Sequence, residues 1–138
     1  DVYKRQDDAA AVAKELMELG VLVNTGAHGQ REGLATHWEM WSFAEGGMSP
    51  MQMLATATIN PARYLGMDAD LGSIETGKLA DLQVVDGNPL EDVKSTDRIT
   101  HVMVNGRLYR ANDLGEEVTG SRPAPTLWWH NQPQHQIR

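Results

Sequence analysis

The stretch 72–90 constrains the fold of this chain more than any other. It reads G-S-I-E-T-G-K-L-A-D-L-Q-V-V-D-G-N-P-L, and a turn at 75–77 leads into a short β-run over 81–85. The string Asp86-Gly87-Asn88-Pro89 ends that run, because Gly and Asn tolerate positive φ and Pro lacks the N–H that a β-ladder needs. The sequence predicts one short strand between two turns, with Leu82 and Val84 on one face and Val85 on the other.

A second β-signal lies further along the chain. The runs 99–104 and 107–110 flank Asn105-Gly106, the strongest short hairpin signal, because a type I′ turn needs positive φ at both central residues. His101, on the first strand of this hairpin, is predicted to be structural.

The tail after Leu114 is polar and Pro-rich, and it is either disordered or laid over the body of the protein, with Trp128-Trp129 as anchors.

The first half of the chain has a helical pattern. Residues 7–19 are predicted to form an amphipathic helix that Gly20 ends, followed by a buried strand at Val21–Val23. A helix over 32–45 carries Leu34, Trp38 and Trp41 on one stripe, where core packing is favoured over stacking on a substrate. A capping box at 49–52 opens a helix that reaches about residue 58, and Asn60-Pro61 starts another that ends at Gly66.

The stretch 72–90 closely resembles a motif near the C-terminus of amidohydrolase-superfamily metal hydrolases, especially the imidazolonepropionase-like branch. Residues 58–66 (T-I-N-P-A-R-Y-L-G) match the family's approach to that motif, and the resemblance extends over roughly residues 10–115. It implies an α/β fold, the C-terminal end of a TIM-like (β/α)₈ barrel plus part of a composite β-sandwich. We expect 1–66 to form the last β/α units of the barrel, 67–115 a portion of the sandwich and 116–138 a polar tail.

On this resemblance the chain is expected to be an incomplete fragment that is inactive alone. It has no initiator Met, and D-V-Y-K-R-Q at 1–6 matches nothing in the family. The remainder of the barrel is then a required partner, and homo-oligomer formation is open. A buried-type strand without its neighbours predicts exposed apolar surface and poor solubility or association.

Composition excludes several classes of function. Nineteen acidic residues against twelve basic ones argue against a nucleic-acid partner, since phosphate neutralisation needs clustered Lys and Arg. The absence of cysteine excludes disulfides and thiolate chemistry. No apolar run reaches the roughly 20 residues of a membrane span.

The loop 24–30, N-T-G-A-H-G-Q, is the best candidate for chemistry. It follows the predicted strand, and the loops at the C-terminal ends of barrel strands build active sites. Glycines at 26 and 29 let the backbone approach a ligand closely. His28 between them is therefore the predicted catalytic residue.

The resemblance adds a mechanism to this position. The superfamily uses one or two divalent metals, held by a His-x-His pair, often a carboxylated Lys, and further His. An Asp after the last strand, in a G-T-D string, binds metal and takes a proton from the attacking water. Here Ala27-His28 stand where Thr-Asp is usual, so His28 replaces that Asp as metal ligand or base. A similar G-A-H-G-Q string occurs in a branch often fused to a TolB-like propeller, which implies a periplasmic or secreted location if this chain is TolB-fused and a cytoplasmic one otherwise.

The other ligands are missing from this chain, which has five histidines and no His-x-His. The pair His130 and His135 is weak evidence for a metal site. The resemblance implies a divalent metal, with zinc favoured, and a small amide or peptide-like substrate that Gln30 and His37 contact. For His37 a half-exposed polar role is the favoured alternative.

The predicted function is that of a hydrolase of carbon–nitrogen bonds in a cyclic amide, amidine or dipeptide-like substrate. The alternative is a stand-alone α+β binding module derived from such an enzyme, without catalysis, that uses exposed tryptophans as a contact surface.

Overall fold

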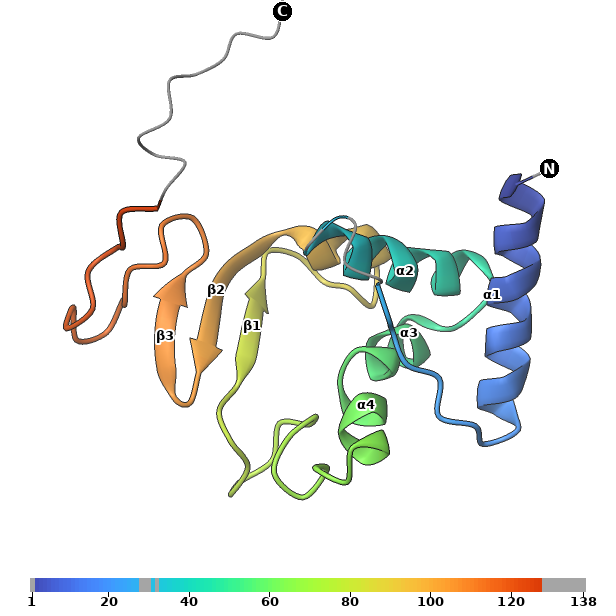
Figure 1. The fold of residues 1–138 in the computed structure, drawn as a ribbon, viewed down its shortest axis with the longest axis horizontal. Coiled ribbons are helices and arrows are strands. Elements are labelled where there is room, and N and C mark those ends of the chain that lie inside the picture. The colour runs from blue at the N-terminus through green and yellow to red at the C-terminus, as the bar shows by residue number, and fades with distance from the viewer. Residues whose placement is uncertain (1, 28–30, 32, 128–138) are drawn as a thin grey trace, which may run out of the picture.

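A computed structural model describes residues 2–27, 31 and 33–127. Helices come first and strands last: α1 (Val2–Glu18), α2 (Leu34–Glu45), α3 (Pro50–Thr56), α4 (Ile59–Tyr64), β1 (Leu82–Val85), the 3-10 helix η1 (Val93–Asp97), β2 (Ile99–Val104) and β3 (Arg107–Arg110). In Figure 1, α1 lies at one end and the sheet at the other, with α2 between them. None of the helices in these residues has the length and apolar character needed to cross a membrane.

The local signals for helix ends are confirmed where they were strongest. Ser49 Oγ accepts from Gln52 N at 3.3 Å, and Gln52 Oε1 accepts from Ser49 N at 2.9 Å. Gly20 follows α1 with φ 89°. The prediction for Asn60 is wrong in detail, because α4 begins at Ile59 after Thr58 and Asn60 lies buried inside it.

The strands form one antiparallel sheet in the order β1-β2-β3. The predicted hairpin is confirmed: Asn105 and Gly106 have φ 48° and 76°, and Val104 pairs with Arg107. The register of β1 against β2 shifts between Val84 and Val85. The shift breaks the simple alternation, so Leu82 and Val85 are half-buried, whereas Val84 is 47% exposed.

The core of the described residues is small and helical. Its buried apolar side chains are Ala10, Met40, Met48, Met53 and Ala62. The stripe predicted on the second helix is only partly buried, because Leu34 and Trp38 are 40% and 47% exposed and Met40 is the buried residue of α2. Large apolar side chains such as Leu19 and Ile74 are exposed, and so are Val21 and Leu22 of the predicted strand run, at 48% and 39%.

The first part of the tail lies against the sheet. Glu116 N donates to Arg122 O and Glu117 N donates to Leu108 O, both at 2.9 Å. Tyr109 and Glu116 form an isolated bridge. The predicted anchors Trp128 and Trp129, with His130 and His135, lie outside the described residues.

Candidate functional site

The segment 21–27 leads from the end of α1 toward the start of α2 (Figure 1, blue). The strand predicted at Val21–Val23 has no β-ladder among the described residues, whose sheet is built only from 82–110. Side chains and carbonyls of the helices hold the segment instead. Thr25 N donates to Thr56 O at 3.0 Å, and Asn60 Nδ2 donates to Val23 O at 3.0 Å.

The end of this segment is held by a carboxylate. Glu39 Oε2 on α2 accepts hydrogen bonds from Gly26 N and from Ala27 N, both at 2.7 Å. Such charge-assisted bonds are about twice as strong as neutral ones. They act where the backbone needs support, because Ala27 has φ 34°, a region that residues with a side chain rarely adopt.

The two principal site predictions fall just beyond this point. His28 and Gln30 lie outside the described residues, and their roles stay predictions. The structure describes the backbone before them, up to Ala27.

His37, the third predicted site residue, lies half-buried on α2. Its ring is tilted by 38° to that of Trp41, with the ring centroids 6.4 Å apart. Its Nδ1 is buried and has no hydrogen-bond partner in the described part of the chain; Asn24 Oδ1 is the other side-chain atom in that state. A buried polar atom without a partner costs about 1–3 kcal/mol, so each marks a place where a partner would be favourable.

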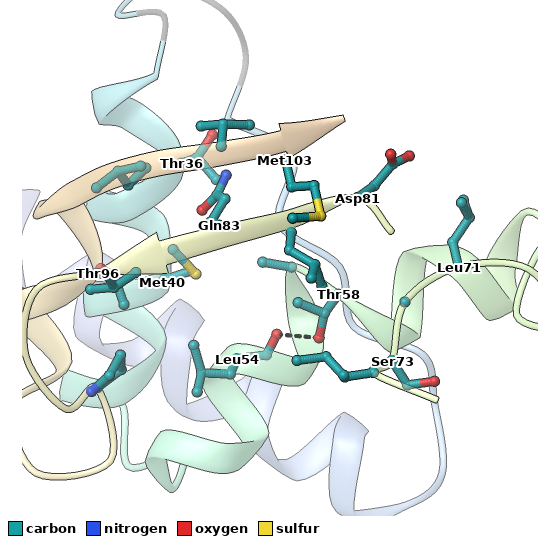
Figure 2. Close-up of a pocket in the computed structure, with 18 of the residues that line it drawn as sticks. Thr36, Met40, Leu54, Thr58, Leu71, Ser73, Asp81, Gln83, Thr96 and Met103 are labelled. Carbon is teal, nitrogen blue, oxygen red and sulfur yellow. Dashed lines mark hydrogen bonds between the residues drawn. The ribbon is translucent and has the colours of Figure 1, made fainter. Parts of the chain in front are cut away.

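His37 also lines a cavity of about 760 Å³ between the sheet and helices α2 and α3. Gln83 and Met103 of the strands line it together with Leu54 and Thr58 (Figure 2). Several polar groups at its wall are already engaged: Thr58 Oγ1 donates to Leu54 O, and Asp81 accepts from Asn105 N.

No described residue of 21–27 lines this cavity. The structure therefore does not bring His37 and the described part of the candidate loop into one pocket.

The described residues do not supply a metal site. Within residues 2–27, 31 and 33–127, no three His, Cys, Asp or Glu side chains are grouped so that they could hold an ion. Glu39, whose carboxylate lies beside the candidate loop, is occupied by backbone N–H groups. A complete set of metal ligands would therefore need residues from outside these ranges.

The fold and sequence together define a class of protein. The structure is similar to that of a Xaa-Pro dipeptidase solved with methionine in its active site, with a TM-score of 0.67 and 35% identity over 74% of this chain and 25% of that one. The model of the amidohydrolase family matches residues 3–109. The chain belongs to the amidohydrolase family.

Curated relatives agree with this assignment. Ochratoxinase from Aspergillus niger is 29% identical over 103 residues, which cover 72% of this chain and 22% of that protein. Imidazolonepropionase from Symbiobacterium thermophilum is 51% identical over 39 residues, which cover 28% of this chain and 9% of that protein. The predicted family is confirmed, and the chain spans about a fifth of the length of the ochratoxinase.

Sequence reasoning missed the residues that hold the candidate loop. Glu39 lies in mid-helix between Trp38 and Met40, and its partners are backbone groups 12 and 13 positions earlier. Asn60 looked like a helix cap, yet its amide reaches 37 positions back. Neither contact can be recognised from the residues that neighbour it in the sequence.

Proposed function

We propose that this chain forms the C-terminal part of a metal-dependent hydrolase that cleaves carbon–nitrogen bonds in a cyclic amide, amidine or dipeptide-like substrate. The observation that carries the proposal is the family match over residues 3–109. The relatives named a dipeptidase and an imidazolonepropionase support this range of substrates. In this proposal 1–66 belong to the barrel, 67–115 to a composite sandwich and 116–138 to the tail.

His28 is the catalytic residue of the proposal. As a neutral imidazole it accepts a proton from the attacking water or serves as a metal ligand, and both roles suit an unperturbed pKa near 6.5. Gln30 and His37 contact the substrate, and the buried, unpaired Nδ1 of His37 supports a polar contact there.

The cofactor of the proposal is a divalent metal, with zinc favoured. A structural zinc site usually has four protein ligands, and a catalytic one has three protein ligands and a water. The described residues contain no group of three such side chains, so they do not form either kind of site. We therefore derive no step through the metal from this chain.

The test is to read the coding sequence upstream of Asp1 and to express the complete gene product. An open frame that carries His-x-His supports the proposal, and a start codon directly upstream contradicts it. The product is assayed against Xaa-Pro dipeptides, N-acyl amino acids and cyclic amides. We expect hydrolysis that a chelator removes, and a loss of about 10²–10⁴-fold in kcat for His28→Ala. Full activity of that variant would refute the role of His28.

A further inference from the structure

Glu39 makes an unusual contact for a residue in the middle of a helix. One oxygen, Oε2, takes two consecutive backbone N–H groups, those of Gly26 and Ala27, each at 2.7 Å. Consecutive N–H groups that converge on one point form an anion-binding concavity, and here the anion belongs to the protein itself. The carboxylate thus fixes the orientation of two adjacent peptide planes.

Two residues of the following helices, Thr56 and Asn60, also hold the same segment further back. Asn60 Nδ2 donates to Val23 O, and Thr56 O accepts from Thr25 N. Along the chain, Glu39 is the last of these anchors before position 28, and among the three it alone carries a charge. It also acts at Ala27, whose φ of 34° makes this the position that most needs to be held.

We propose that Glu39 is a positioning residue of the hydrolase: its carboxylate fixes the backbone at Gly26–Ala27 and so sets where the next side chain stands. This inference rests on the proposed function, because it concerns the placement of the predicted catalytic position. The competing explanation is that Glu39, a half-buried side chain, only stabilises the fold.

The first test does not depend on catalysis. Amide hydrogen exchange is measured residue by residue for the chain, for Glu39→Gln, which keeps an acceptor oxygen but not the charge, and for Glu39→Ala, which keeps neither. Glu45→Gln is the matched control, since Glu45 lies exposed on the same helix with only a 3.9 Å ion pair to Lys94.

Exchange at Gly26 and Ala27 is expected to speed up about tenfold or more in Glu39→Ala, less in Glu39→Gln and not at all in the control. Exchange at Thr25, which is bonded to Thr56, should stay unchanged. Unchanged exchange at Gly26 and Ala27 overturns the inference. An equal increase across α2 and α3 also overturns it, because it shows a role in global stability alone.

The second test uses the kinetics of the complete gene product. A misplacement of about 1 Å costs roughly a hundredfold in rate, so Glu39→Ala should lower kcat by about that factor and leave KM within a few-fold. Glu39→Gln should recover part of the loss. Local loss of protection with unchanged kcat overturns the positioning role. Absence of hydrolysis by the unmodified protein instead overturns the proposed function, and the exchange data then decide separately whether Glu39 holds the loop.

Discussion

The indole Nε1 of Trp41 donates a hydrogen bond of 2.9 Å to Thr96 Oγ1, although the two residues lie 55 positions apart. Trp41 belongs to α2 and Thr96 to η1, so the bond joins the helical part of the chain to the part that carries the sheet. Thr96 is only 4% exposed, and its hydroxyl also donates to Val93 O at 3.1 Å. A partly buried polar contact thus links residues 1–66 to residues 67–115, which the sequence assigned to separate parts of the fold.

Replacement of Trp41 by Phe should destabilise the protein by about 1 kcal/mol, because the indole donor is lost. Urea denaturation followed by circular dichroism measures this change. Trp38→Phe is the matched control, since Trp38 is 47% exposed and forms no hydrogen bond in the described residues, and its effect should stay within about 0.5 kcal/mol. Equal effects of the two variants would show that the bond to Thr96 adds nothing.

The packing of α1 against the end of α2 depends on Gly46 having no side chain, and adding one tests this packing. A Cβ at Gly46 would lie 2.4 Å from Ala10 Cβ and 2.6 Å from Ala10 C. Gly46 has φ −72°, which any residue adopts, so the obstacle is steric only. Gly46→Ala should cost about 1–3 kcal/mol of stability. Urea denaturation measures this loss, and a change of less than about 0.5 kcal/mol would contradict this packing.

Glu116 has the most strongly shifted pKa among the described residues with a resolved value. Hydrogen bonds from the hydroxyl and N–H of Thr119, and then from Ser121, lower the pKa of this carboxyl from 4.5 to about 2. The folded protein therefore holds the ionised form more tightly than the unfolded chain does. The resulting stabilisation is present above pH 4.5 and is lost as the pH falls through about 2.

Thermal unfolding between pH 7 and pH 2 tests this. Glu116→Gln should lower Tm at pH 7, and its deficit should shrink as the pH falls from 4.5 toward 2. The pKa values of Asp113 and Glu75 are also lowered, by Arg110 and by Ser73 respectively, and they act in both proteins, so the difference isolates Glu116. A deficit that is constant with pH would contradict the shifted pKa.

Zinc binding by the 138-residue chain alone should be weak and without fixed stoichiometry, because its described residues contain no group of three ligands. Calorimetric titration measures this, with His28→Ala as the comparison. Submicromolar binding that depends on His28 would show that the chain builds a site of its own.

Predictions from local signals succeeded because both partners lie within a few residues. Asn105 and Gly106 adopt the positive φ that their hairpin requires, and Ser49 and Gln52 form the predicted capping box. Each of these motifs is stabilised by its own backbone geometry, whatever surrounds it.

Predictions that depended on contacts between elements distant in the sequence were less accurate. The apolar run at Val21–Val23 has the composition of a buried strand, but composition does not supply a ladder partner. Trp38 lies on the predicted stripe of α2 and stays 47% exposed, because no described element covers that face. The contacts of Glu39 with the loop were invisible for the related reason that side chain to backbone bonds across 12 or 13 residues leave no periodic pattern.

The anchor at Asn60 shows what such a contact contributes. Its side chain is 4% exposed, and its Nδ2 donates to Val23 O at 3.0 Å, holding the candidate loop segment against α4. Asn60→Ala removes this donor and leaves a cavity, so we expect a loss of about 1–3 kcal/mol in urea denaturation. Asn112→Ala, at an exposed position, is the control and should change stability by less than about 0.5 kcal/mol.

Because Thr56 and Glu39 hold the segment separately, amide exchange at Thr25, Gly26 and Ala27 in Asn60→Ala should rise less than tenfold. If Asn60→Ala instead released all three amides together, the anchors would act as one cooperative unit, and Glu39 would have no separate hold on the loop.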